Sequence, residues 1–351
     1  MMANSSLLCS RYGLLLRIAL SSLILALIIW TVWPLLPFGR SRRPQTIVLY
    51  GFSIIEPAIT KSVFPAFQKK WMAQTGQEVE MIASFAGSGT VTNQLIMGVP
   101  AELAILSTGL DAARLSESGT INGETWKLLP YGGVINRSPF VILVRPGNPK
   151  KIHDFSDLTR PGIRIVHPDP FTSGAANWAI IAEYGSAVRQ PDADPDAGRS
   201  MLLGIWRNVV AQAGSGRAVR TQFDNGFGDA LITYEQDALW SRSHSSVPFQ
   251  IIYPRSTILS EHTLVVIDRN ISKERKELIQ AFVDFLWSEE AQRLFVENGF
   301  RSVDEKLNSA NRSFGYIADP FFIGDFGGWQ QAKRTIIDEI WKNRVLKELR
   351  P

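Results

Sequence analysis

Residues 84–90 read SFAGSGT and place a glycine on each side of Ser88, just before a stretch with helical character. The first N–H groups of a helix have no partner inside the helix, and glycine lets a ligand approach the backbone closely. The N–H groups of Ser88, Gly89 and Thr90 can therefore point at one spot, where the helix dipole adds about half a positive charge. Such a loop suits an anion.

The same loop lacks the residues of nucleotide-binding motifs. A P-loop has a lysine after its last glycine, whereas Gly89 is followed by Thr90 and Val91. The glycine spacing also differs from the G-x-G-x-x-G of a dinucleotide fingerprint. An isolated Gly-Ser-Gly is alternatively a tight turn in which the serine caps a helix.

A second serine loop favours the anion site. In HPDPFTSGAANW, residues 167–178, Ser173 is followed by Gly174 and Ala175 at the start of another helical stretch. The two serines lie 85 positions apart, so their helices belong to different parts of the fold. Two helix N-termini could thus hold one anion from two sides.

These loops need a scaffold of alternating strands and helices. Apolar runs typical of buried strands occur in order along the chain, at 46–50, 78–84, 102–107, 139–145, 162–167, 229–235, 249–254 and 262–268. Helices are expected between and after them, at 56–75, 88–97, 173–184, 201–213, 272–287 and 329–349. This alternation predicts an α/β fold.

The strands and helices fall into two sets, joined at RPGNP (145–149) and again near ILSEHT (258–263). Two lobes linked by a two-segment hinge are therefore expected, with the ligand between them at the ends of the strands. The predicted boundaries are listed in chain order: 46–143 for the first part of lobe 1, 144–257 for lobe 2, and 258–351 for the second part of lobe 1 with the C-terminal helices.

The segment 18–39 carries no charge and is long enough to cross a membrane. It ends in WPLLPFGRSRR rather than in the small residues of a signal-peptide cleavage site, which favours an uncleaved signal anchor. Residues 1–17 would then lie in the cytoplasm and 40–45 would form a linker. Cys9, the single cysteine, precedes the segment, so no disulfide is expected.

The net charge of +4 belongs to the amino terminus, because five arginines and no acidic residue precede residue 44. The rest of the chain has 32 basic and 33 acidic side chains. This balance argues against nucleic acid as a partner.

Several blocks resemble the bacterial sulfate-binding proteins, the periplasmic receptors of sulfate/thiosulfate ABC importers. They are SFAGSGTVTNQLIMGVPAELAIL, RPGNPKKIHDFSDLTRPGIRI, HPDPFTSGAANWAIIAEYG, NGFGDALITYEQDAL and FGGWQQAK, and the similarity spans about 46–335. The resemblance implies a type II periplasmic-binding-protein fold, in which each lobe is a mixed sheet flanked by helices, here preceded by a transmembrane helix. It also implies that the lobes close on dehydrated sulfate or thiosulfate and deliver it to a permease, at the periplasmic or extracellular face of the membrane.

The resemblance implies sulfate contacts by neutral donors at the starts of helices and at loops: Ser88, Gly89, Ser173, Gly174, Ala175, Gly216, Tyr234 and Gly51. Tyr234 stands where the family has a tryptophan donor, and a phenol O–H can accept a hydrogen bond as well as donate one. A site lined only by donors favours an anion without a proton, and Tyr234 relaxes this preference. No metal or cofactor is implied.

Other interpretations remain open. The chain could be a receptor for molybdate or phosphate, or a membrane-tethered anion sensor without an importer. An enzyme is the alternative of a different class, but there is no G-x-S-x-G elbow and the four histidines lack zinc-site spacing. His167 with Asp169 is more typical of surface or loop-shaping residues. Asp229 and Glu235 have a spacing that is ordinary for a strand, and carboxylates beside a bound dianion would repel it. We therefore expect no catalytic residues.

Overall fold

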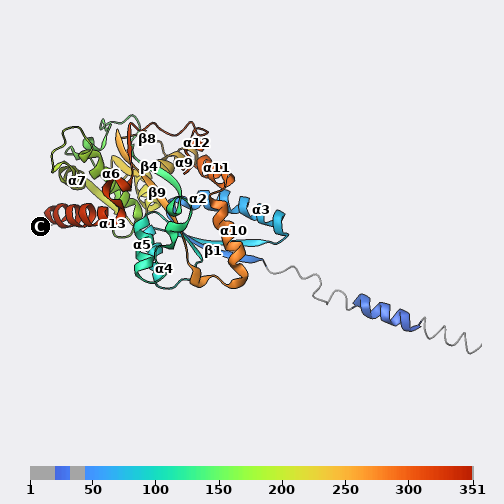
Figure 1. Ribbon diagram of the computed structural model, residues 1–351. Helices are drawn as coiled ribbons and strands as arrows, with labels where there is room; N and C mark the ends of the chain where they lie inside the picture. Colours follow the sequence, from blue (N-terminus) through green and yellow to red (C-terminus); the bar gives the residue numbers. More distant parts are fainter. Residues whose placement is uncertain (1–19, 32–43, 350–351) are drawn as a thin grey trace, which may run out of the picture. The chain divides into compact units, whose positions relative to one another are not determined.

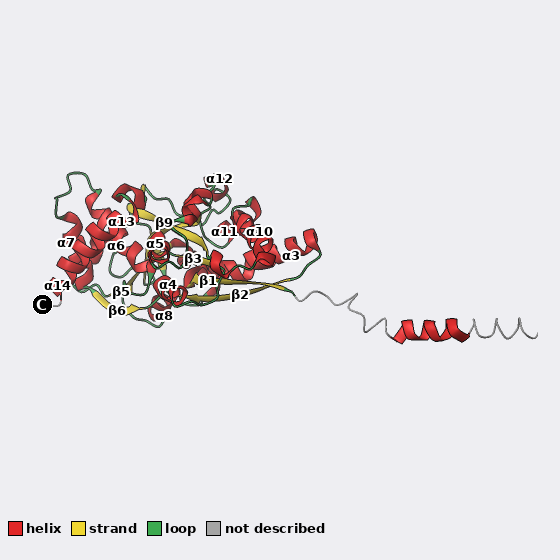
Figure 2. Ribbon diagram, turned by 60° about the horizontal axis from the view of Figure 1, so that its bottom comes forward, coloured by secondary structure: helices red, strands yellow, loops and turns green. Residues whose placement is uncertain are grey.

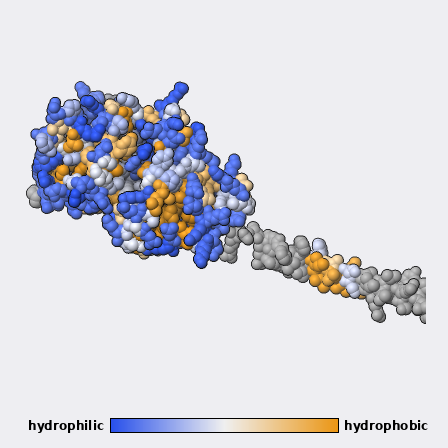
Figure 3. All heavy atoms as spheres, viewed as in Figure 1, coloured by the Kyte–Doolittle hydropathy of each residue, from blue (hydrophilic) through white to orange (hydrophobic). Residues whose placement is uncertain are grey.

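The computed structural model describes residues 20–31 and 44–349 (Figure 1). The chain divides into two units between residues 44 and 45, and each is described by itself. Residues 20–31 are helical and expose apolar side chains (Figure 3), namely Leu20, Leu23, Ile24, Leu25, Leu27, Ile28, Ile29 and Trp30. Within the described ranges, no helix combines the length and the apolar character needed to cross a membrane. The remainder of the predicted anchor, 18–19 and 32–39, lies outside these ranges, as does Cys9.

The second unit is built on one mixed sheet with the strand order β2-β1-β3-β9-β4-β7-β5-β6 (Figure 2). The strands are β1 (Gln45–Phe52), β2 (Val79–Ala86), β3 (Leu103–Leu106), β4 (Val134–Val144), β5 (Ile165–Pro168), β6 (Val209–Ala213), β7 (Ala230–Tyr234), β8 (Gln250–Ile252), β9 (Ser256–Val266) and β10 (Asp319–Phe321). We call β2, β1 and β3 the first half of the sheet and β7, β5 and β6 the second half.

Two long strands join these halves. β9 pairs with β3 of the first half, and β4 pairs with β7 of the second half. β4 and β9 also pair with each other, from Val134 opposite Thr263 to Pro139 opposite Leu259. Both strands extend further toward their amino ends than the predicted 139–145 and 262–268, so one continuous pair of strands passes between the halves.

Helices cover both halves. They are α2 (Glu56–Ala58), α3 (Phe64–Thr75), α4 (Ser88–Ile96), α5 (Gly109–Glu117), α6 (Gly174–Val188), α7 (Ala197–Arg207), α8 (Gly216–Asp224), α9 (Glu235–His244), α10 (Lys276–Leu286), α11 (Glu289–Glu297), α12 (Glu305–Asn308), α13 (Gly328–Ala332) and α14 (Leu346–Leu349). The helices α4 and α5 pack on the first half, and α6 and α8 on the second. The predicted helix 56–75 is present with a π-helical segment, Ile59–Val63, and it ends at Gly76 in the left-handed conformation that favours glycine (φ 68°).

The predicted helix 201–213 is wrong in its last part. The helix α7 ends at Arg207, and 209–213 form the edge strand β6. Val209 and Val210 are β-branched, and alternate residues of β6 are exposed, as on a half-buried strand. The apolar pattern of the helix continues across this boundary into the strand.

The C-terminal helices pack on the second half. The π-helical segment Lys333–Val345 contacts α6 and α7, and α14 contacts α7. Trp341 of this segment lies edge-on against Trp206 of α7, with ring centroids 4.8 Å apart. Helices near the end of the chain therefore belong structurally with the part that contains α6 and α7 (Figure 1).

Candidate functional site

One small cavity gathers most of the predicted contact residues. The predicted residues that line it are Ser88, Ser173, Gly174, Ala175, Gly216 and Tyr234. The other lining residues are Phe52, Ser53, Ile54, Ala86, Gly87 and Ser107, so no lining residue carries a charge. The region of the cavity that the centre of a water-sized sphere can occupy has a volume of about 10 Å³. In this conformation the cavity suits a single small ion and excludes a sugar, an amino acid or a nucleotide.

Three helices begin at the cavity. Ser88 is the first residue of α4, Gly174 of α6 and Gly216 of α8, and all three are buried. Each helix follows a strand of the sheet, α4 from the first half and α6 and α8 from the second. Because the first N–H groups of a helix have no intrahelical partner, the cavity is lined by main-chain donors and by the positive ends of three helix dipoles. This arrangement stabilises negative charge.

Ser173 precedes α6 with an extended backbone (φ −114°, ψ 119°) and its side chain does not cap the helix. The residue is only 3% exposed. In the part of the chain that the structure describes, its hydroxyl donates to no protein group. Because a buried hydroxyl normally has a partner, Ser173 is a donor available to a ligand in the cavity.

The hydroxyl of Ser88 is already engaged. It donates to Asp111 Oδ2 at 2.7 Å and accepts from the N–H of Ser107 at 2.9 Å. Asp111 is buried, and burial raises the pKa of its carboxyl, while the bond from Ser88 and the charge of Arg114 oppose the rise. Ser88 therefore offers its main-chain N–H to the cavity rather than its hydroxyl.

Ser107 was not among the predicted residues. Its hydroxyl lies 2.8 Å from the hydroxyl of Tyr234, and its carbonyl accepts from Trp178 Nε1 at 2.7 Å. Burial raises the pKa of Tyr234, so this phenol stays protonated. The position of Ser107 at the carboxyl end of the strand predicted at 102–107 was a usable signal, because ligands bind at the carboxyl ends of strands in α/β sheets. Ser53, also missed, follows β1 in the same way.

Gly89 and Gly51 lie outside the lining. The N–H of Gly89 donates to the carbonyl of Thr172 at 3.2 Å, so in this conformation it is not available to a ligand. Gly51 lies within β1, where a β-carbon would come within 2.8 Å of the ring of Phe85. The residues after it, Phe52 and Ser53, reach the cavity instead.

The two halves touch closely around the cavity. A β-carbon added at Gly87 would overlap the carbonyl oxygen of Gly214 and lie 2.5 Å from that of Thr172. One added at Gly174 would lie 2.6 Å from Ser107 Oγ. Glycine is thus required where the loop before α4 meets the loops before α6 and α8.

Charged groups stand behind the lining. Arg217 Nη2 lies 3.5 Å from the carbonyl oxygen of Ser53, and the guanidinium lies over the ring of Trp240, 5.0 Å from its centroid. Asp237 is buried, and burial raises its pKa, with the charges of Arg220 and Arg217 acting in the opposite direction. A ligand in the cavity would therefore contact neutral groups first.

His262 packs behind the cavity wall, with its ring 4.6 Å from that of Phe52 and 5.3 Å from that of Tyr234. Burial lowers its pKa from 6.5 to about 3. Between these values the unfolded chain binds the proton and the folded chain does not, so stability is lost as the pH falls below about 6.5. Lowering the pH from about 7 to about 5 is expected to remove about 2 kcal/mol of unfolding free energy through this residue.

Urea unfolding of the chain and of His262→Gln at both pH values tests this expectation. The variant should lose about 2 kcal/mol less than the unchanged chain on acidification. Equal losses in the two proteins would show that His262 does not govern the acid response.

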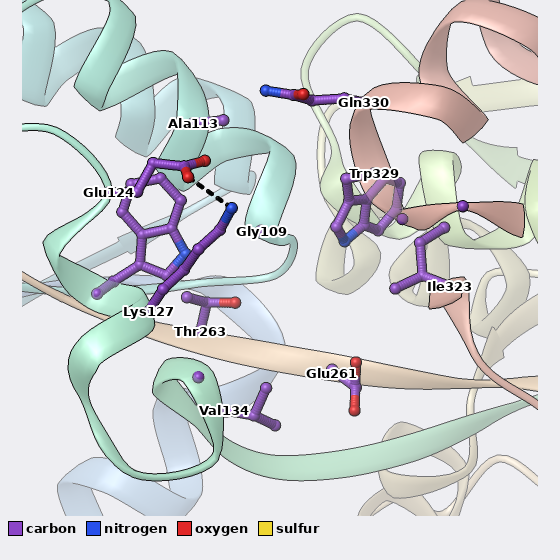
Figure 4. A pocket seen from close by; sticks show the side chains of 14 residues that line it. Gly109, Ala113, Glu124, Lys127, Val134, Glu261, Thr263, Ile323, Trp329 and Gln330 are labelled. Carbon is purple, nitrogen blue, oxygen red and sulfur yellow. Dashed lines mark hydrogen bonds and ion pairs between the residues drawn. The ribbon is translucent and has the colours of Figure 1, made fainter. Parts of the chain in front are cut away.

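A larger cavity, about 300 Å³ by the same measure, lies beside α5 and the C-terminal segment (Figure 4). It contains none of the predicted contact residues. Lys127 donates to Glu124 at 2.7 Å on its wall, and Trp329 faces it from α13. Trp329 packs edge-on against Trp178, with centroids 4.4 Å apart. The convergence of helix N-termini, rather than cavity size, therefore marks the candidate site.

Comparisons with known proteins place the chain in a family. A family model described as bacterial extracellular solute-binding protein matches residues 55–301. The sulfate-binding protein of Escherichia coli is 33% identical over 77% of this chain and 83% of that protein. The thiosulfate-binding protein of Pseudomonas aeruginosa is 28% identical over 85% of this chain and 90% of that protein. Among solved structures, the sulfate-binding protein SubI from Mycobacterium tuberculosis matches with a TM-score of 0.75 and 30% identity, over 83% of this chain and 98% of that one.

Proposed function

The chain belongs to the bacterial extracellular solute-binding proteins, and on this premise we propose that it captures sulfate or thiosulfate and delivers it to an ABC importer. The observation that carries the proposal is the meeting of three helix N-termini and the Ser173 hydroxyl, which has no protein partner within the described residues, at one small, uncharged cavity. Relatives named sulfate-binding and thiosulfate-binding proteins support the choice of anion.

Neutral donors can hold a doubly charged anion if enough of them converge. Each hydrogen bond to a charged group contributes about 1.5 to 3 kcal/mol, and a low-dielectric surrounding strengthens all of them. The proposed donors are Ser173 Oγ and the main-chain N–H groups of Ser88, Gly174, Ala175 and Gly216. Fixed dipoles then replace the water shell of the ligand without the cost of burying a second charge.

We propose that the two halves of the sheet act as two lobes of a type II periplasmic-binding-protein fold. The first lobe takes in 46–143, the second 144–257, and the segment from 258 returns to the first. The terminal helices α13 and α14 belong in this scheme with the second lobe, because the segment between them packs on α6 and α7. The ligand binds first to one lobe, and closure adds the donors of the other.

The predicted anchor and the proposed location go together. A receptor that supplies an importer must face the periplasm or the extracellular space, and an apolar helix within 18–39 would hold it at the membrane. The closed form would then dock on a permease subunit in that membrane. Binding alone, without a reaction, is all that this role requires.

Removal of the Ser173 hydroxyl is expected to weaken sulfate binding about 10- to 150-fold, the equivalent of one hydrogen bond to a charged group. Calorimetric titration of the purified full-length chain and of Ser173→Ala measures this. Ser313→Ala, at an exposed serine, serves as the matched control and should leave the affinity unchanged. Equal affinity of Ser173→Ala and the unchanged chain would remove Ser173 from the site.

A further inference from the structure

A buried hydroxyl can accept a hydrogen bond from a ligand O–H at no cost only if its own proton already has a partner. Otherwise accepting leaves an unpaired O–H, which costs about 1 to 3 kcal/mol. Within the described residues Ser173 has no such partner, so its proton is left for the ligand and its hydroxyl acts as a donor. The hydroxyls of Ser107 and Tyr234 differ from it, because they are partners of each other.

The two hydroxyl groups of Ser107 and Tyr234 contribute two oxygens and two protons. One of these protons forms the hydrogen bond between the two oxygens. If Ser107 donates to Tyr234, the Tyr234 proton is left for a ligand oxygen, and Ser107 Oγ keeps a lone pair. If Tyr234 donates to Ser107 instead, the Ser107 proton is left for a ligand oxygen, and the Tyr234 oxygen keeps a lone pair. In both arrangements the pair offers one donor and one acceptor on two different oxygens.

The pair lies where a ligand would meet it. Both residues line the cavity, and Ser107 Oγ would come within 2.6 Å of a β-carbon placed on Gly174, at the start of α6. The Tyr234 ring is packed against Phe140, 4.6 Å between centroids, and is fully buried. Apart from the ligand, its hydroxyl has Ser107 as its hydrogen-bond partner within the described residues.

We propose that the Ser107–Tyr234 pair makes this cavity accept a tetrahedral oxyanion that carries one proton, in addition to fully ionised sulfate. The inference rests on the proposed anion-binding function and specifies its substrate class. A fully ionised anion would use the donor of the pair alone. An anion with one O–H would use the donor and the acceptor together.

Sulfate and hydrogen phosphate are the probes, because at about pH 8 both are tetrahedral dianions and they differ by one O–H group. Calorimetry of the purified full-length chain is expected to give dissociation constants within about tenfold of each other. Phosphate binding more than about tenfold weaker than sulfate binding would overturn the inference and leave the proposed function standing. Failure of both anions to bind would instead overturn the proposed function.

Tyr234→Phe identifies the groups responsible. The variant keeps the ring and leaves Ser107 with one free proton, so the number of donors to sulfate is unchanged. The loss of affinity is expected to be about 5- to 100-fold greater for phosphate than for sulfate, because a single Ser107 hydroxyl remains where the pair offered a donor and an acceptor on two oxygens. Ser173→Ala is the matched control, since it removes a donor that both anions use and should weaken both alike.

Ser107→Ala provides a second route to the same result, with the Tyr234 hydroxyl left as the single donor. Melting temperatures of all variants show whether they fold. An equal loss of sulfate and phosphate affinity in Tyr234→Phe and in Ser107→Ala would overturn the assignment to this pair. A selective loss of phosphate in either folded variant supports it.

Discussion

Replacing Gly87 by alanine is expected to weaken sulfate binding by about 5- to 150-fold, with little effect on the stability of the ligand-free chain. Gly87 has φ −58° and ψ 139°, a conformation that alanine adopts without strain. The added β-carbon would overlap Gly214 O and press on Thr172 O, which are main-chain atoms on the opposite side of the cavity. Overpacking of this kind costs about 1 to 3 kcal/mol, and here it destabilises the arrangement in which the two halves are in contact.

The same substitution at Gly324 is the matched control. A β-carbon at Gly324 would meet nothing within 4 Å, so Gly324→Ala should bind sulfate as the unchanged chain does. Calorimetric titration and thermal unfolding of both variants separate binding from folding. Wild-type sulfate affinity in Gly87→Ala would mean that the halves need not approach as closely as they do in this structure.

Replacing Arg301 by methionine is expected to lower the unfolding free energy by about 3 to 5 kcal/mol. The guanidinium donates to both oxygens of Glu235, at 2.8 and 2.9 Å, and Glu235 is fully buried. The N–H of Gly315 donates to the same carboxylate at 2.8 Å. Without Arg301 the buried carboxylate would lose its main partner.

The loss of the Arg301–Glu235 ion pair also bears on the candidate site, because Glu235 directly follows Tyr234. Urea unfolding measures the loss of stability, and Arg293→Met is the matched control. Arg293 pairs with Glu289 on an exposed helix surface, and its removal should cost at most about 0.5 kcal/mol. A loss below about 1 kcal/mol in Arg301→Met would show that the Glu235 carboxylate is compensated in another way.

The sequence was sufficient to predict the loops that start α4 and α6, because each combines a strand, a small-residue loop and a helix within a short stretch of chain. The α/β alternation was readable for the same reason. The partners of Ser88 and Tyr234 were not readable. Asp111 and Ser107 are brought to them only when β3 takes its place in the sheet, and Ser107 and Tyr234 are 127 residues apart.

The role of Gly89 shows the same limit. A free N–H at a helix start follows from local geometry, whereas its bond to Thr172 depends on how two distant loops meet. Gly87 likewise looked like part of a turn, and its close contact with Gly214 appears only in the folded chain. Local chemistry was predictable, and contacts between the halves required the structure.

A crystal structure of the full-length chain with selenate tests the central claim most directly, because selenium in this tetrahedral dianion can be located by its anomalous scattering. We expect one strong selenium peak in the cavity, with oxygens about 3 Å from Ser173 Oγ and from the N–H groups of Ser88 and Gly174. Selenate bound elsewhere, with none between α4 and α6, would contradict the claim that neutral donors from both halves hold the anion.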